Sequence, residues 1–170
     1  MQKFLDPTND VAFKKIFGTE SQKPALISFL NAVLRLKEGS RIIETEFIET
    51  IQFLPQENIP EIREGRRVIF DIRCRDESGN DFIVEMQNRS IPEFVKRSQF
   101  YAAKVYGNQL SAGRKYFELC PVVMVAISSQ CLFDDSRKPV SYHRIMNEET
   151  LNVHLKDLTF VFVELPKFNK

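Results

Sequence analysis

Residues 68–87 read VIFDIRCRDESGNDFIVEMQ, and their pattern is the strongest indication of the fold of the chain. The even-numbered residues on both sides of its polar centre are apolar, which is the period of a β-strand with one buried face. Ile69 and Ile83 are the exceptions to this alternation. The centre, residues 76–81, is rich in turn-forming residues, and Gly79 can take a positive φ there. The stretch therefore predicts a β-hairpin.

Three polar side chains of this hairpin fall on one face. If the apolar residues of both strands face one core, Asp71, Glu85 and Gln87 must share the opposite face. Two facing carboxylates repel each other, so such a pair either raises the pKa of one member or binds a cation. Ligand sets made only of oxygen suit Mg²⁺ or Mn²⁺, and a metal held in this way can activate water at a phosphodiester.

A second interpretation needs no metal. In it, Asp71 and Glu85 solvate the outer face of an antiparallel hairpin, with Arg73 and Arg75 as their ion-pair partners. The hairpin pattern alone favours this interpretation. The choice between the two depends on the rest of the chain.

Length and composition indicate one ordinary domain over residues 1–170, because a chain of this length with 43% hydrophobic residues can bury a proper core. Its 24 basic and 23 acidic residues nearly cancel, so any nucleic-acid binding must be local. The three widely spaced cysteines favour reduced thiols. Because the sequence shows neither a signal peptide nor a membrane-spanning run, we expect a cytoplasmic protein with no membrane partner.

The order of predicted elements indicates a mixed α/β sheet with a long crossover helix. Helices are predicted from the Asp6–Asp10 start signal to Gly18, from Pro24 to Lys37, and from Pro92 to about Leu110 or Gly113. Besides the hairpin, strands are predicted within 42–54, 121–128, 140–146 and 158–165, and a loop at 55–60. The last two strands extend an αβββαβ core.

Four stretches make the chain resemble the PD-(D/E)XK nuclease superfamily, and within it the recombination-promoting nuclease (Rpn) and transposase family. They are residues 9–18 (NDVAFKKIFG), 29–31 (FLN), 70–72 with 83–87, and 97–106 with Gly113 and Tyr116. The resemblance runs from residue 6 to the end. It implies a restriction-endonuclease-like fold and a metal-dependent DNA endonuclease active in recombination or on mobile elements. It also implies Mg²⁺ or Mn²⁺ as cofactor, DNA as partner and no organic cofactor.

Carried over by motif, Asp71 and Glu85 would be the metal ligands, with the backbone carbonyl of Met86 as a further one. Gln87 stands where the superfamily usually has lysine. A neutral amide can orient the attacking water but supplies no positive charge there. Asp10 could approach the same face as a third acid, or could serve only to cap its helix.

Four other residues are candidate DNA contacts. Arg97, Tyr101 and Lys104 follow one another at i, i+4 and i+7, so they form one helical stripe that could contact backbone phosphate. Tyr101 could equally pack in the core, and Arg97 could pair with acids. Lys14 could substitute for the missing lysine, although a solvated helical lysine is the commoner case.

The resulting expectation is a Mg²⁺-dependent DNA endonuclease. The alternative is a DNA-binding or assembly domain that keeps the nuclease fold but cuts weakly or not at all, which Gln87 motivates. Family members commonly continue beyond a strand like that at 158–165, so we expect the chain to be truncated at its C-terminus or a short relative. A homodimer is compatible with this picture.

Overall fold

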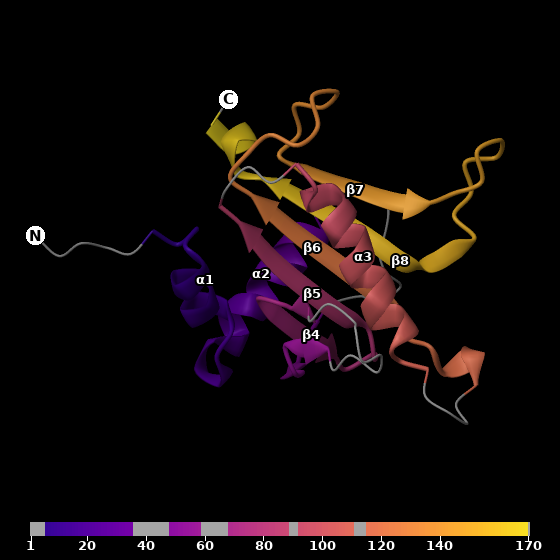
Figure 1. The fold of residues 1–170 in the computed structure, drawn as a ribbon, viewed down its shortest axis with the longest axis horizontal. Helices are drawn as coiled ribbons and strands as arrows, with labels where there is room; N and C mark the ends of the chain where they lie inside the picture. The colour runs from indigo at the N-terminus through magenta and orange to yellow at the C-terminus, as the bar shows by residue number, and fades with distance from the viewer. Residues whose placement is uncertain (1–5, 36–47, 59–67, 89–91, 111–114, 170) are drawn as a thin grey trace, which may run out of the picture.

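The computed structural model describes residues 6–35, 48–58, 68–88, 92–110 and 115–169, and it contains a six-stranded mixed sheet (Figure 1). The strands of this sheet, in spatial order, are β1 (Ile51–Phe53), β4 (Ile72–Asp76), β5 (Asp81–Gln87), β6 (Val122–Ser128), β8 (Leu155–Glu164) and β7 (Val140–Ile145). The β5–β6 and β6–β8 pairs are parallel and the others antiparallel. The predicted restriction-endonuclease-like α/β fold is confirmed.

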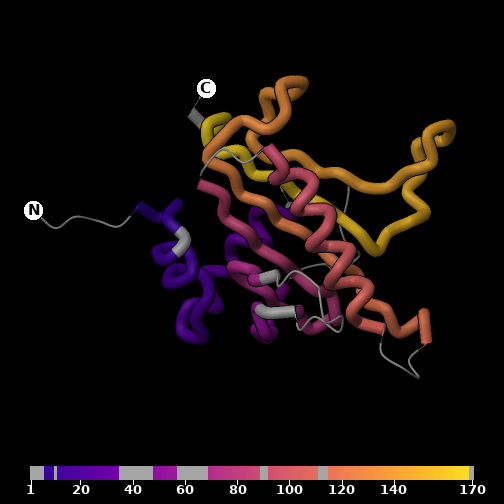
Figure 2. The backbone as a smooth tube through the Cα atoms, viewed as in Figure 1, coloured from indigo at the N-terminus to yellow at the C-terminus, as the bar shows by residue number. Residues whose placement is uncertain are grey.

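Helices cover both faces of the sheet. In Figure 1, α3 (Phe94–Gly107) crosses in front of the strands, and α2 (Lys23–Arg35) lies behind them, beside α1 (Asp10–Phe17). The backbone tube in Figure 2 shows the same arrangement, with α3 in front of the strands, and the short 3-10 helix η2 (Tyr116–Glu118) precedes β6 in the chain. Two further 3-10 helices, η1 (Glu20–Gln22) and η3 (Leu165–Asn169), precede α2 and follow β8. The helix between two parallel strands is the predicted crossover.

The first helix has the predicted boundaries. Gly18 ends α1, and its N–H donates to the carbonyl of Lys14. The N-terminal cap is Asn9, whose side chain accepts the N–H of Val11. The idea that Asp10 caps the helix is wrong, because Asp10 is the first helical residue and the cap lies one position earlier.

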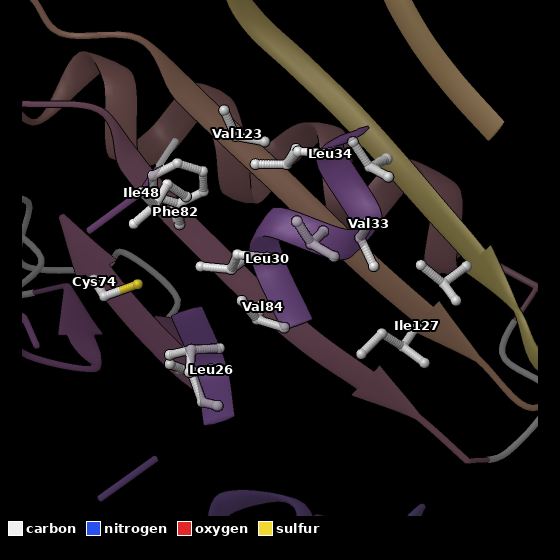
Figure 3. Close-up of a cluster of buried hydrophobic side chains, with 14 of the residues drawn as sticks. Leu26, Leu30, Val33, Leu34, Ile48, Cys74, Phe82, Val84, Val123 and Ile127 are labelled. Carbon is white, nitrogen blue, oxygen red and sulfur yellow. The ribbon is translucent and has the colours of Figure 1, made fainter. Parts of the chain in front are cut away.

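One hydrophobic cluster lies between α2 and the sheet. Figure 3 shows Leu26, Leu30 and Val33 of α2 packed over Val84 and Ile127 of the central strands. A second cluster lies under α3, where Phe94 and Val105 cover Ile83 and Met124. Because both faces are covered, every residue of β5 is buried. This explains why Ile83 breaks the predicted alternation: its face is not exposed to water.

The first strand of the predicted hairpin is interrupted. It consists of β3 (Val68–Ile69) and β4, with a break at Phe70 and Asp71. The alternation predicts Phe70 on the same face as Ile72, but Phe70 lies in the α3 cluster, where its ring meets that of Tyr101 edge-on at 5.3 Å. The break turns the chain, so the strand period does not continue across it.

The region before the hairpin also differs from its prediction. Within the expected strand at 42–54, only Ile51–Phe53 is extended in the sheet, and residues 42–47 lie outside the described residues. Ile48 is held instead by Asn31 of α2, whose amide bonds both its N–H and its carbonyl. Part of the predicted loop at 55–60 forms a two-residue strand, β2 (Glu57–Asn58), which pairs with β3.

The remaining boundaries agree within a few residues. The helix predicted to reach Leu110 or Gly113 ends at Gly107, and residues 36–37 of the second predicted helix fall outside the described residues. All three cysteines are free thiols, of which Cys74 is buried and Cys131 is exposed. None of the helices in the described part of the chain has the length and apolar character that crossing a membrane requires.

Candidate metal centre

The side chains of Asp71 and Glu85 each accept a hydrogen bond from the backbone of the opposite arm of the hairpin. The backbone N–H of Asp71 donates to Glu85 Oε1 at 2.9 Å, and the backbone N–H of Met86 donates to Asp71 Oδ2 at 3.0 Å. The β4–β5 register pairs Ile72 with Val84, which places Asp71 beside Glu85. The bond between the Met86 N–H and Asp71 accounts for the strand break. In a regular antiparallel pair, the N–H of Met86 would donate to a backbone carbonyl of the neighbouring strand, but here it donates to the side chain of Asp71.

Glu85 is buried, with only 5% of its surface exposed. Burial, and then the negative charge of Asp71, raise the pKa of Glu85 to about 8. The interpretation in which both carboxylates solvate an outer hairpin face is therefore wrong for Glu85, because α3 covers that face. Its proposed ion pairs are also wrong: Arg73 and Arg75 both pair with the buried Asp81.

Lys14 of α1 lies next to the carboxylate pair. Its Nζ is 3.2 Å from Asp71 Oδ1, with 37% of the lysine side chain and 15% of the aspartate side chain exposed. The charge of Lys14 also lowers the pKa of Glu85 in part. The structure therefore brings this predicted residue to the site, as an ion-pair partner rather than as an unpaired surface lysine.

Gln87, at the end of β5, is buried and contacts Arg97 of α3. The guanidinium NH2 group of Arg97 donates to Gln87 Oε1 at 2.6 Å. The same guanidinium lies over the rings of Phe94, at 5.1 Å, and Tyr101, at 5.8 Å. Among the described residues, Arg97 Nε is buried and has no hydrogen-bond partner.

The remaining predicted site residues are Tyr101, Lys104, Met86 and Asp10. Tyr101 is half-buried, and Lys104 lies over the exposed ring of Phe100 at 5.8 Å, about two helical turns beyond Arg97. The side chain of Met86 is buried in the α2 cluster, so only its backbone is available as a ligand. The side chain of Asp10 lies outside the described part of the structure, and its role stays a prediction.

The two carboxylates suit a hard divalent cation. Across the described residues there is no group of three or more His, Cys, Asp or Glu side chains that could hold a metal. A site with two carboxylates and space for water and substrate is typical of Mg²⁺, whereas structural zinc needs four nitrogen or sulfur ligands. The raised pKa of Glu85 fits this interpretation, since a cation at this position would stabilise the ionised form.

The sequence pattern does not predict two of the contacts at this site. The side-chain amide of Gln56 donates to the backbone carbonyl of Asp71 at 2.9 Å, which helps to fix the strand break. The bond between Arg97 and Gln87 joins residues on separate elements. The sequence predicts that Arg97 contacts DNA or an acid, and nothing in the pattern points to the amide of Gln87.

Comparison with known protein families shows the family to which the chain belongs. Residues 7–170 match the model of a family described as PD-(D/E)XK nuclease family transposase. The chain belongs to this family, which confirms the superfamily assignment made from the motifs. A search of curated proteins and a search of solved structures each found no match.

Proposed function

We propose that this protein is a metal-dependent DNA endonuclease and that Asp71 and Glu85 hold its Mg²⁺ or Mn²⁺. Membership of a nuclease and transposase family supports the reaction class. The observation that carries the proposal is the carboxylate pair itself: a buried glutamate fixed beside an aspartate by two hydrogen bonds to the backbone. Burying two like charges together is costly unless a cation is bound between them or one of them is protonated.

The other residues of the centre have supporting roles in this proposal. The Met86 carbonyl and Asp10 would complete the set of oxygen donors. When bound, a divalent cation lowers the pKa of water and offsets the negative charge of the phosphodiester. Gln87 would orient the attacking water, as a catalytic residue that supplies a hydrogen bond but no charge.

In this proposal, DNA binds along α3 and beside α1, which carries Lys14. The sequence of α3, FVKRSQFYAAKVYG, contains three basic residues and no acidic one, although the whole chain is nearly neutral. Lys14, Arg97 and Lys104 would contact backbone phosphates, and Tyr101 would support them. By resemblance to the Rpn family, the DNA would be cut in the cytoplasm during recombination or movement of mobile elements.

Conversion of supercoiled plasmid tests the proposal. The wild-type protein should nick or linearise the plasmid in Mg²⁺ and leave it intact in EDTA. Asp71→Asn keeps an acceptor for the Met86 N–H but removes a charged ligand, so it should lose cutting by at least ~100-fold. Asp134→Asn, at an exposed aspartate, is the matched control and should cut like the wild type.

The alternative function is DNA binding without cutting. Its supporting observation is that the side-chain oxygen of Gln87 is already bonded to Arg97. Metal-dependent plasmid binding with no conversion, by a folded wild-type protein, would favour this alternative. Equal cutting by the wild type and Asp71→Asn would contradict the proposed centre.

A further inference from the structure

The centre lacks a positive charge at the position where the superfamily usually has one. Gln87 is neutral, yet a phosphoryl group under attack gains negative charge that a nearby cation stabilises. Two cationic side chains lie at this site: Lys14 Nζ is 3.2 Å from Asp71 Oδ1, and the guanidinium of Arg97 donates to Gln87 Oε1 at 2.6 Å. The question is which of them can serve the substrate.

Lys14 is the less suitable of the two. Its ammonium forms an ion pair with Asp71, which is a proposed metal ligand, and its side chain is more than a third exposed. It sits on a flexible stem that carries a large rotamer entropy. Lys14 therefore offsets the charge of Asp71 and is less suited than Arg97 to hold the reacting phosphate.

Arg97 is held rigidly. It lies in the first turns of α3, and its guanidinium contacts Gln87 at 2.6 Å and the faces of Phe94 and Tyr101. Phe94 is itself buried, and the ring of Tyr101 rests against Phe70. A cation packed between rings and tied to an amide loses little entropy when it binds an anion.

Arg97 also has donors to spare. A guanidinium has five N–H groups, and its Nε is buried without an acceptor in the described part of the protein. A buried donor without a partner costs free energy that an incoming acceptor would recover. Phosphate oxygens are the acceptors that an arginine fork fits best.

We propose that Arg97 binds the reacting phosphate and supplies the positive charge that position 87 lacks. Gln87, whose side-chain oxygen holds the guanidinium, is then a positioning residue for Arg97 in addition to any contact with water. The inference rests on the proposed nuclease function. It goes beyond a general DNA contact, because it puts Arg97 at the phosphate that is cut.

The inference is tested by removing the positive charge of residue 97 and then placing a positive charge at position 87. Arg97→Met should lower the single-turnover cutting rate by ~100-fold, the size expected for losing a charged donor at the reacting group. Arg97→Lys should fall between that variant and the wild type, because it keeps the charge but loses the fork. The double variant Gln87→Lys with Arg97→Met should recover at least ~10-fold over Arg97→Met alone. A purely structural role for Arg97 would predict no recovery.

Binding without metal gives a second readout. Anisotropy of a labelled DNA duplex in EDTA, measured at several salt concentrations, should show that Arg97→Met reduces the slope of log K against log salt by about one. Lys156→Met is the control, since Lys156 is exposed at the start of β8, at the opposite end of the sheet from Gln87. Circular dichroism checks that each variant is folded.

The outcomes separate the inference from the function on which it rests. If Asp71→Asn stops cutting while folded Arg97→Met cuts like the wild type, the inference is wrong and the nuclease proposal stands. Failure of the charge relocation to restore any rate would also overturn it. If the wild type does not cut at all, the nuclease proposal fails, and an unchanged salt slope in Arg97→Met would overturn the phosphate contact as well.

Discussion

Glu85 is a carboxyl group that the fold removes from water and places beside a second acid. With its pKa raised to about 8, the folded protein holds a proton on it to about pH 8, whereas an ordinary glutamate releases its proton near pH 4.5. A group with a raised folded-state pKa contributes stability that is fully present below the ordinary pKa and is lost as the pH rises to the folded one. The centre is therefore a source of instability at neutral pH when no cation is bound.

The raised pKa of Glu85 predicts how the stability of the protein changes with pH. In EDTA, the urea midpoint of the wild type should fall progressively from pH 4.5 to 8 because of Glu85, and this contribution should level off above pH 8. Glu85→Gln keeps an acceptor for the Asp71 N–H and has no proton to lose, so its midpoint should fall less. Glu148→Gln, at an exposed glutamate, should follow the wild type. Parallel curves for all three proteins would contradict the burial of an ionisable group at position 85.

At the scale of elements, the β4–β5 hairpin shows what a sequence pattern can predict. Period and turn residues correctly predict the buried face formed by Ile72, Cys74 and Val84 and the turn at Gly79, which has a φ of +89°. They could not show that α3 covers the opposite face, because a period of two describes one strand and not what packs on it. Without that fact, a solvated Glu85 is the simpler interpretation.

The sequence could not predict the strand break or the contact of Arg97 with Gln87, because both depend on how separate parts of the chain pack together. The break at Phe70 depends on a bond between the Asp71 side chain and the Met86 backbone, and the residue types alone do not specify it. The bond from Arg97 to Gln87 depends on where α3 starts relative to the end of β5. The alternation correctly predicts that Asp71 and Glu85 lie near each other, but only the packing of the elements defines their surroundings.

Two glycines provide a prediction for these elements. Gly79→Ala should destabilise the protein by about 1 kcal/mol, because a φ of +89° is unfavourable for a residue with a Cβ. Gly107 is the last residue of α3, and a Cβ added there would meet no other atom within 4 Å. Gly107→Ala should therefore be neutral or stabilise by up to about 1 kcal/mol. Chemical denaturation measures both, and a Gly79→Ala variant as stable as the wild type would contradict the described turn.

For the whole molecule, charge is balanced overall and uneven locally. The net charge is +1, but the basic residues near the centre lie on α1 and along α3. Long-range attraction to DNA should therefore be weak, and affinity should come from a few direct phosphate contacts. This distribution suits a protein that binds DNA mainly where the centre can reach it.

Salt dependence tests this distribution. Three phosphate contacts, from Lys14, Arg97 and Lys104, predict a slope of about −3 for log K against log salt on duplex DNA. Lys104→Met should make the slope less negative by about one, and Lys156→Met should leave it unchanged. A wild-type slope of about −6 or steeper would mean that other residues provide most of the contacts.

Calorimetric titration with Mn²⁺ asks whether Asp71 and Glu85 form one metal site. It is done at pH 8, because the pKa of Glu85 is raised to about 8. The wild type and Asp134→Asn should bind the ion with the same affinity. Asp71→Asn and Glu85→Gln should each weaken binding by at least ~10-fold while remaining folded. Unchanged Mn²⁺ affinity in both site variants would contradict a metal centre at this carboxylate pair.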